Sequence, residues 1–115
     1  MIIRGEVIRG AQLGRKMGFP TANIDAEALT DIENGVYASK VRLADSVYSA
    51  MSNIGMRPSV DGTTRLLETH LFDFEGDLYG QEIEVLLLRK IRDEKRFSSI
   101  EELQAQLQRD AQECR

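Results

Sequence analysis

Hydrophobic and polar residues alternate along much of this chain with the period of two that is typical of β-strands. The clearest alternation spans residues 64–74, whose even positions carry Leu66, Glu68, His70, Phe72 and Phe74. Apolar and β-branched runs predict further strands at residues 2–9, 35–43, 47–54 and 83–88. Short polar turns at residues 44–46 and 75–77 separate neighbouring strands, so we expect five or six strands that are mostly linked as hairpins.

Two segments interrupt this pattern. Residues 10–34 contain three glycines, a proline and a patch of polar residues with no sustained period, and residues 55–63 are rich in turn-forming residues. We expect the first segment to be long and irregular. Compact domains seldom carry such a segment without a functional reason.

The end of the chain changes to a helical period. Ser98 or Ser99 is expected to cap the helix, and Glu101 or Glu102 would complete a capping box three residues later. The apolar face of this helix is expected to hold Ile100, Leu103, Leu107 and Ala111. Strands followed by one helix predict a single domain, a mainly β antiparallel barrel closed at one end.

The length and composition fit one domain and argue against nucleic-acid-binding, membrane-spanning and secreted proteins. The chain has 115 residues, 42% of them hydrophobic, which is enough for one core. Its net charge of −4 argues against broad nucleic-acid binding. No apolar run approaches the roughly 20 residues of a membrane-spanning helix, and the N-terminus lacks the order of a signal peptide. Cys114 is the only cysteine, so we expect no internal disulfide and a reducing, cytoplasmic setting.

The segment between residues 10 and 23 holds the first candidate for chemistry. Glycines allow backbone N–H groups to approach a phosphate, and neighbouring cations add positive charge; the residues of this kind are Gly10, Gly14, Arg15, Lys16 and Gly18. Thr21 and Asn23 would present two hard oxygen donors on one side of an extended chain, as Mg²⁺ accepts. The spacing differs from a P-loop, and a glycine-rich surface loop with ordinary turns is the alternative.

Glu68 is the second candidate. It shares a strand face with aromatic residues, so it either points inward or lies on a face that opens to a pocket. The alternatives are a solvated strand face, or a carboxylate paired with an arginine such as Arg65 on a neighbouring strand. For His70, the only histidine, hydrogen bonding or packing is expected, because one histidine cannot build a zinc site.

Taken in order, these segments resemble the riboflavin kinase family. Residues 14–24 are similar to the family's nucleotide loop, and their Pro-Thr-Ala-Asn core is very specific. Later blocks match at residues 35–38, 53–55, 67–70, 78–80 and 91–97. The resemblance runs from Gly5 to about Ala111. It implies a six-stranded antiparallel Greek-key barrel with a C-terminal α-helix.

The resemblance also implies an activity and site residues. The expected reaction transfers the γ-phosphoryl group of ATP to the 5′-hydroxyl of riboflavin, which gives FMN and ADP. Glu68 would be the catalytic base, and Thr21 and Asn23 would hold the Mg²⁺ of Mg-ATP. The loop of residues 10–20, including Pro20, would cover the phosphates. Tyr79 would lie by the adenine, and Arg92 and Phe97 would contact the flavin.

Other readings of the same residues stay open. The chain could be a flavin- or nucleotide-binding module without catalysis, or an interaction domain that assembles a larger flavin-synthesising enzyme. Many bacterial relatives carry an N-terminal adenylyltransferase domain that 115 residues could not house, so the chain is a standalone kinase or a module of a longer parent. We expect a monomer whose partners are riboflavin and ATP, with no nucleic acid and no membrane.

Overall fold

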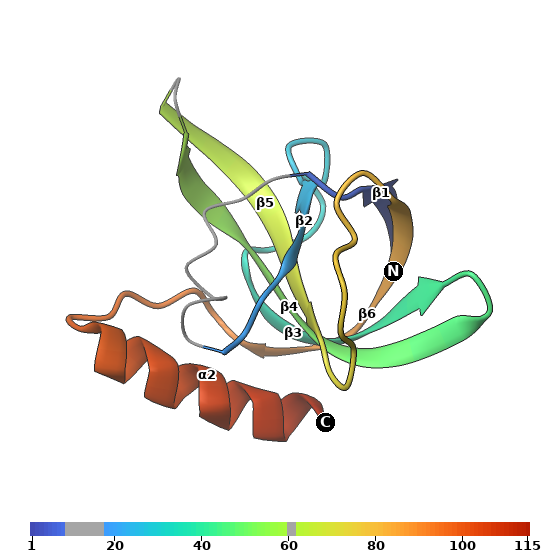
Figure 1. Ribbon diagram of the computed structural model, residues 1–115. Helices are drawn as coiled ribbons and strands as arrows, with labels where there is room; N and C mark the ends of the chain where they lie inside the picture. The colour runs from blue at the N-terminus through green and yellow to red at the C-terminus, as the bar shows by residue number, and fades with distance from the viewer. Residues whose placement is uncertain (9–17, 60–61) are drawn as a thin grey trace.

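The computed structural model describes residues 1–8, 18–59 and 62–115, and this part of the chain forms six strands and one helix (Figure 1). The elements are β1 (Ile2–Glu6), β2 (Ala22–Asp25), β3 (Gly35–Leu43), β4 (Ser46–Ser59), β5 (Gly62–Leu71), β6 (Glu82–Arg92) and α2 (Ile100–Cys114). No helix in these residues is long and apolar enough to cross a membrane.

All six strands join one antiparallel sheet in the order β1-β6-β3-β4-β5-β2. Strands β3, β4 and β5 form a meander, and β6 returns to lie beside β3, which is the Greek-key arrangement. The two ends of the sheet meet where Ile8 N–H donates to Asn23 O at 2.7 Å. Gly5 permits the approach, because a Cβ there would lie 2.6 Å from Ile24. The expected barrel is therefore confirmed.

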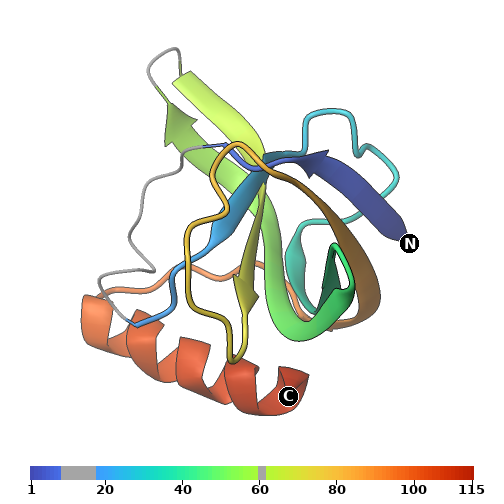
Figure 2. The same cartoon turned by 45° about the vertical axis from the view of Figure 1, so that its right-hand side comes forward.

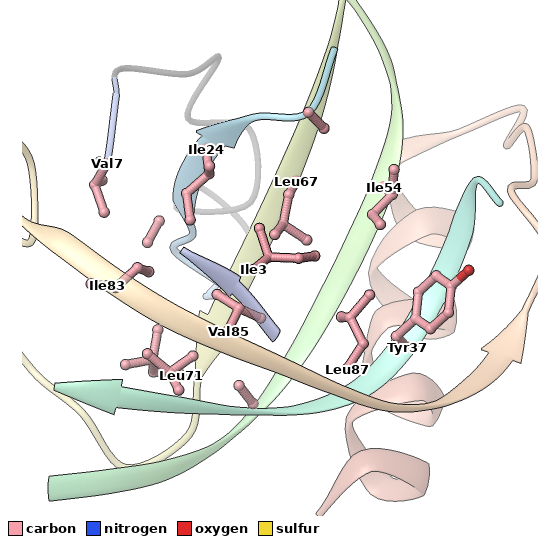
Figure 3. Packing of buried hydrophobic residues seen from close by; sticks show 14 of the residues in the cluster. Ile3, Val7, Ile24, Tyr37, Ile54, Leu67, Leu71, Ile83, Val85 and Leu87 are labelled. Atoms are coloured by element: carbon pink, nitrogen blue, oxygen red, sulfur yellow. The ribbon is translucent and has the colours of Figure 1, made fainter. Parts of the chain in front are cut away.

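Apolar side chains from every strand fill the barrel (Figure 3). The most deeply buried of these are Ile54, Leu67, Ile83, Val41 and Val85. Three hydroxyl groups lie among them: Ser52 Oγ is 2.8 Å from both Ser39 Oγ and Thr69 Oγ1. These mutual hydrogen bonds satisfy polar groups that would otherwise be costly to bury.

Helix α2 packs against the outer surface of the barrel (Figure 2). Ser99 caps it by accepting from Glu102 N–H at 3.1 Å, and Glu102 accepts from Ser98 N–H at 3.2 Å, which confirms the expected capping box. The helix shares a second apolar cluster with outward-facing residues of β3 and β4, namely Val36, Ala38 and Met51. The expectation that the helix closes one end of the barrel is therefore wrong. Ile100, expected on the apolar face, is 60% exposed in the first turn.

Several strand boundaries differ from those that the pattern predicts. β1 ends at Glu6, and β2 lies within the segment expected to be irregular. β4 runs through the segment expected to be rich in turns, although it contains Pro58. Because β3 begins at Gly35, opposite Ile54, the last part of β4 pairs with β5 alone. Proline is tolerated on such an edge.

Candidate functional site

A row of polar side chains crosses three strands on the outside of the barrel. Glu68 in the middle of β5 lies opposite Asn23 of β2 and opposite Asn53 of β4. Residues that lie directly opposite each other point to the same side of a sheet. Leu67, the neighbour of Glu68, is fully buried inside the barrel, so this row faces outward.

Glu68 is a largely buried carboxylate with a charged partner. Its side chain is 17% exposed, and Arg57 Nε and Nη2 both lie 2.7 Å from Glu68 Oε1. Burial raises the pKa of Glu68 above its ordinary value, and the Arg57 guanidinium opposes this rise only in part. The carboxylate is therefore held in one orientation, with a proton affinity higher than that of a solvated glutamate.

Arg65, named above as one alternative partner of this carboxylate, binds other groups. Arg65 bonds to the carbonyl oxygens of Leu29 and Ile32 and donates to Asn34 Oδ1 at 2.8 Å. It thus fixes the connection between β2 and β3. Arg65 lies on β5 itself, and the arginine that pairs with Glu68 from a neighbouring strand is Arg57 of β4.

Thr21 and Asn23 lie together, as the extended spacing predicts. Thr21 Oγ1 donates to Asn23 Oδ1 at 3.2 Å, and Asn23 is 5% exposed. Two oxygens that occupy adjacent positions in the octahedral coordination of one Mg²⁺ are about 3 Å apart. The separation of Thr21 Oγ1 and Asn23 Oδ1 fits such a pair of ligands. The described residues contain no group of three or more His, Cys, Asp or Glu that could hold a metal.

Asn53 was not singled out as a site residue by the sequence. Its Oδ1 atom is the one side-chain nitrogen or oxygen of the described residues that is buried without a hydrogen-bond partner. An acceptor in this position costs stability unless a donor arrives. Residues 53–55 are one block of the family resemblance, but it is the strand register, which places Asn53 opposite Glu68, that connects Asn53 with the site.

The segment that leads into β2 is held by His70. Its Nδ1–H donates to Pro20 O at 2.8 Å, and its ring makes edge contacts with Phe19 and Phe72. The expected hydrogen-bonding and packing role of His70 is confirmed. Gly18 has a φ of 86°, a backbone conformation that favours glycine. Four residues of the expected phosphate loop, Gly10, Gly14, Arg15 and Lys16, lie outside the described residues.

A cavity of about 60 Å³ lies beside this segment, between Pro20, Thr21 and Ala22 and the connection from β5 to β6. Asp77 and Leu78 of that connection line it. Tyr79 follows them and is 50% exposed, with its N–H donating to Asp77 Oδ1 at 2.9 Å. The cavity is much smaller than the roughly 300–1,000 Å³ of a complete ligand site, so it could hold only part of a nucleotide.

Arg92 is the last residue of β6, and Phe97 lies in the connection between β6 and α2. The guanidinium of Arg92 contacts both carboxylate oxygens of Asp110 at 2.8–3.1 Å and lies 5.8 Å from the centroid of Phe97. Arg92 therefore ties α2 to β6. In the connection from β6 to α2, Glu94 reaches Arg57, with Oε1 3.4 Å from Nη1, so Glu94 contacts the same guanidinium that binds Glu68.

The chain resembles known proteins along its whole length. A family profile described as "Flavokinase: Riboflavin kinase" matches residues 1–115. A bifunctional riboflavin kinase/FMN adenylyltransferase of Haemophilus influenzae is 45% identical over 111 residues, which are 96% of this chain and 36% of the relative. An RNA-binding riboflavin kinase of Bacillus subtilis is 46% identical over 110 residues, 95% of this chain and 47% of the relative. The chain thus spans less than half the length of these curated relatives.

Two solved structures share the fold. The riboflavin kinase of Trypanosoma brucei superposes with a TM-score of 0.68 and 27% identity, covering 98% of this chain and 76% of that one. A Streptococcus pneumoniae structure described as a macrolide-efflux protein has a TM-score of 0.81 and 33% identity, covering 96% of this chain and 37% of that one.

Proposed function

Because this chain belongs to the riboflavin kinase family, we propose that it transfers the γ-phosphoryl group of ATP to the 5′-hydroxyl of riboflavin, giving FMN and ADP. The observation that carries this proposal is the arrangement around Glu68. A buried carboxylate lies opposite Asn23, which fits magnesium, and opposite Asn53, which has a buried acceptor without a donor. The ribityl chain of riboflavin supplies hydroxyl donors, whereas a phosphate group supplies acceptors.

Glu68 is the proposed general base. Both contacts with Arg57 fall on Oε1, so Oε2 is the oxygen that can accept the proton of the attacking 5′-hydroxyl. Accepting that proton as the oxygen attacks the γ-phosphorus strengthens the nucleophile. The rest of the catalysis is positioning and charge stabilisation, as in other phosphoryl transfers.

Thr21 and Asn23 are the proposed protein ligands of magnesium, which would neutralise charge on the phosphates when bound. The cavity beside Thr21 supports a nucleotide at this end of β2, with Pro20 and Gly18 in the segment that approaches it. Tyr79 as an adenine contact, and Arg92 and Phe97 as flavin contacts, remain predictions. Since the donor groups of Arg92 already bind Asp110, we favour Phe97 as the direct contact.

Thr21→Ala and Asn23→Ala are each expected to weaken the use of Mg-ATP. Loss of even an outer-shell partner typically weakens metal binding about 10–100-fold, so the KM for Mg-ATP should rise by at least about tenfold. Steady-state kinetics at several magnesium concentrations measure this effect. Thr64→Ala, which removes an exposed hydroxyl that donates to Glu27, is the matched control. An unchanged magnesium dependence in both site variants would rule them out as ligands.

The pH dependence of kcat/KM, which reports the free enzyme, should show the raised pKa of Glu68. Only the carboxylate can accept a proton, so kcat/KM should fall as the pH falls through a pKa above the ordinary value of about 4.3. The same shift means that Glu68 contributes stability below its ordinary pKa, which is lost as the pH rises through the raised value. A pH–rate profile of the folded enzyme measures the acidic limb. A limb at or below the ordinary value would contradict the role of base.

The proposed activity is tested by chromatography of the products from purified protein, riboflavin, ATP and Mg²⁺. Formation of FMN establishes the kinase. If no FMN forms but riboflavin or ADP raises the Tm, the chain is a binding module. If there is neither turnover nor a change in Tm with ligand, the chain shares the fold of the family but not its activity.

The partners are proposed on the same basis. We propose riboflavin and ATP as substrates, no nucleic acid and no membrane, a monomer, and a cytoplasmic setting. The net charge of −4 and a free, buried Cys114 support these assignments. The RNA-binding described for the Bacillus subtilis relative belongs to that protein. An adenylyltransferase domain in a longer parent chain is proposed from the bifunctional relatives.

A further inference from the structure

One guanidinium lies between two carboxylates that come from distant parts of the chain. Arg57 Nε and Nη2 contact Glu68 Oε1 at 2.7 Å, and Arg57 Nη1 contacts Glu94 Oε1 at 3.4 Å. The side chain of Arg57 is 24% exposed, and that of Glu94 is 33% exposed. Arg57 Nη1 also donates to Met56 O at 2.8 Å, which fixes the guanidinium against its own strand.

Gly55 makes room for this arrangement. A Cβ atom at Gly55 would lie 1.7 Å from Glu94 Oε1 and 2.8 Å from Arg57 Nη1. A methyl group in that place would therefore displace the Glu94 carboxylate. Glu94 thus occupies a position that a larger residue would block.

We propose that Arg57 is a positioning residue for the reaction, which orients Glu68 with one edge of its guanidinium and docks Glu94, and with it residues 93–99, with the other. The inference rests on the proposed role of Glu68 as base. The connection that contains Phe97 is then drawn to the same point at which the base is oriented. Arginine suits this task because its planar fork carries several donors in fixed directions, whereas a lysine is a point charge.

The two edges of the guanidinium predict different kinetic effects. Arg57→Met should lower kcat about 10–100-fold, because loss of orientation at the reacting atoms is costly, while the KM for ATP changes less than about twofold. Arg57→Lys should restore only part of kcat. Arg4→Met, which breaks an exposed pair with Glu84 on β1 and β6, is the matched control and should leave kcat unchanged.

The contact of Arg57 with Glu94 is tested with a double-mutant cycle at Gly55 and Glu94. Glu94→Ala should raise the KM for riboflavin several-fold with a smaller effect on kcat, and Gly55→Ala should do the same by displacing Glu94. In the KM for riboflavin, the double variant Gly55→Ala/Glu94→Ala should be no worse than Glu94→Ala alone, because the added methyl then meets no carboxylate. The methyl would still lie 2.8 Å from Arg57 Nη1, so any effect of that contact is expected in kcat. Glu101→Ala, an exposed acid in the first turn of α2, is the control for loss of a charge.

The outcomes separate this inference from the function on which it rests. If the unmodified chain forms no FMN, the proposed function fails. If it forms FMN and Arg57→Met retains kcat, or if Gly55→Ala and Glu94→Ala act additively, the positioning role is wrong. Should Arg57→Met fail to fold, the cycle at Gly55 and Glu94 still decides the docking and Arg57→Lys the orientation.

Discussion

Glu68→Gln is expected to lower kcat for FMN formation by about 10²–10⁴-fold, the usual contribution of a general base. Glutamine keeps the shape of the side chain and can still accept a hydrogen bond from Arg57, but its amide cannot take up the proton. The residues proposed to bind Mg-ATP are others, so the KM for ATP should change little. The loss should therefore fall on kcat.

Steady-state kinetics and a thermal melt together test this expectation. Because burial disfavours the charged form of Glu68 and raises its pKa, the neutral glutamine should not lower the Tm at neutral pH. Glu101→Gln, at an exposed position of α2, is the control and should leave both quantities unchanged. A Glu68→Gln enzyme with the kcat of the unmodified chain would end the assignment of Glu68 as base.

Asp110→Ala is expected to destabilise the fold by about 3–5 kcal/mol, the usual cost of breaking a buried ion pair by removing one partner. Asp110 is 2% exposed and accepts from Arg92 and, at 2.9 Å, from Gln106 Nε2. Its loss would leave a guanidinium with 17% exposure without its charge partner. It would also release the contact that holds α2 to the end of β6.

For a domain of 115 residues, this loss corresponds to a decrease in Tm of roughly 10–20 °C. Differential scanning calorimetry at neutral pH measures it. Glu113→Ala is the matched control, since the Glu113 carboxylate is 63% exposed and lies 3.8 Å from Arg89, and an exposed pair contributes about 0–1 kcal/mol. A shift of only a few degrees in Asp110→Ala would show that water replaces the carboxylate at little cost.

Sequence patterns within a few residues predicted those strands and helix ends whose formation depends on neighbouring residues. The strand over residues 35–43 and the helix cap at Ser99 follow from alternation and capping chemistry within a few residues. β2 could not be predicted in this way, because its four residues are strand only by pairing with β5. The extension of β4 through Pro58 likewise depends on having one partner strand, which no local pattern records.

The candidate site likewise contains residues that the sequence indicated and contacts that only the folded chain brings together. The residue types of Thr21, Asn23 and Glu68 already indicated chemistry, and the pairing of β2 with β5 brings them together. The partners of Glu68 are a different matter. Arg57 meets Glu68 through strand register, and Glu94, from the connection between β6 and α2, meets Arg57, so sequence distance gave no signal for either contact. Asn53 was visible as part of a motif, but its unpaired oxygen exists only in three dimensions.

The junction of Ile8 with Asn23 makes the integrity of the barrel sensitive to what binds the site. Asn23 accepts from Ile8 through its backbone and faces Thr21 with its side chain, so one residue serves both the closure and the proposed magnesium site. Because Ile8 and Asn23 form an isolated β-bridge, local opening of the sheet in the native state would start there. Ligands that immobilise Asn23 would slow hydrogen exchange at the Ile8 amide, which donates to the backbone of Asn23. The exchange rate of this single proton would therefore report whether the proposed magnesium site is occupied.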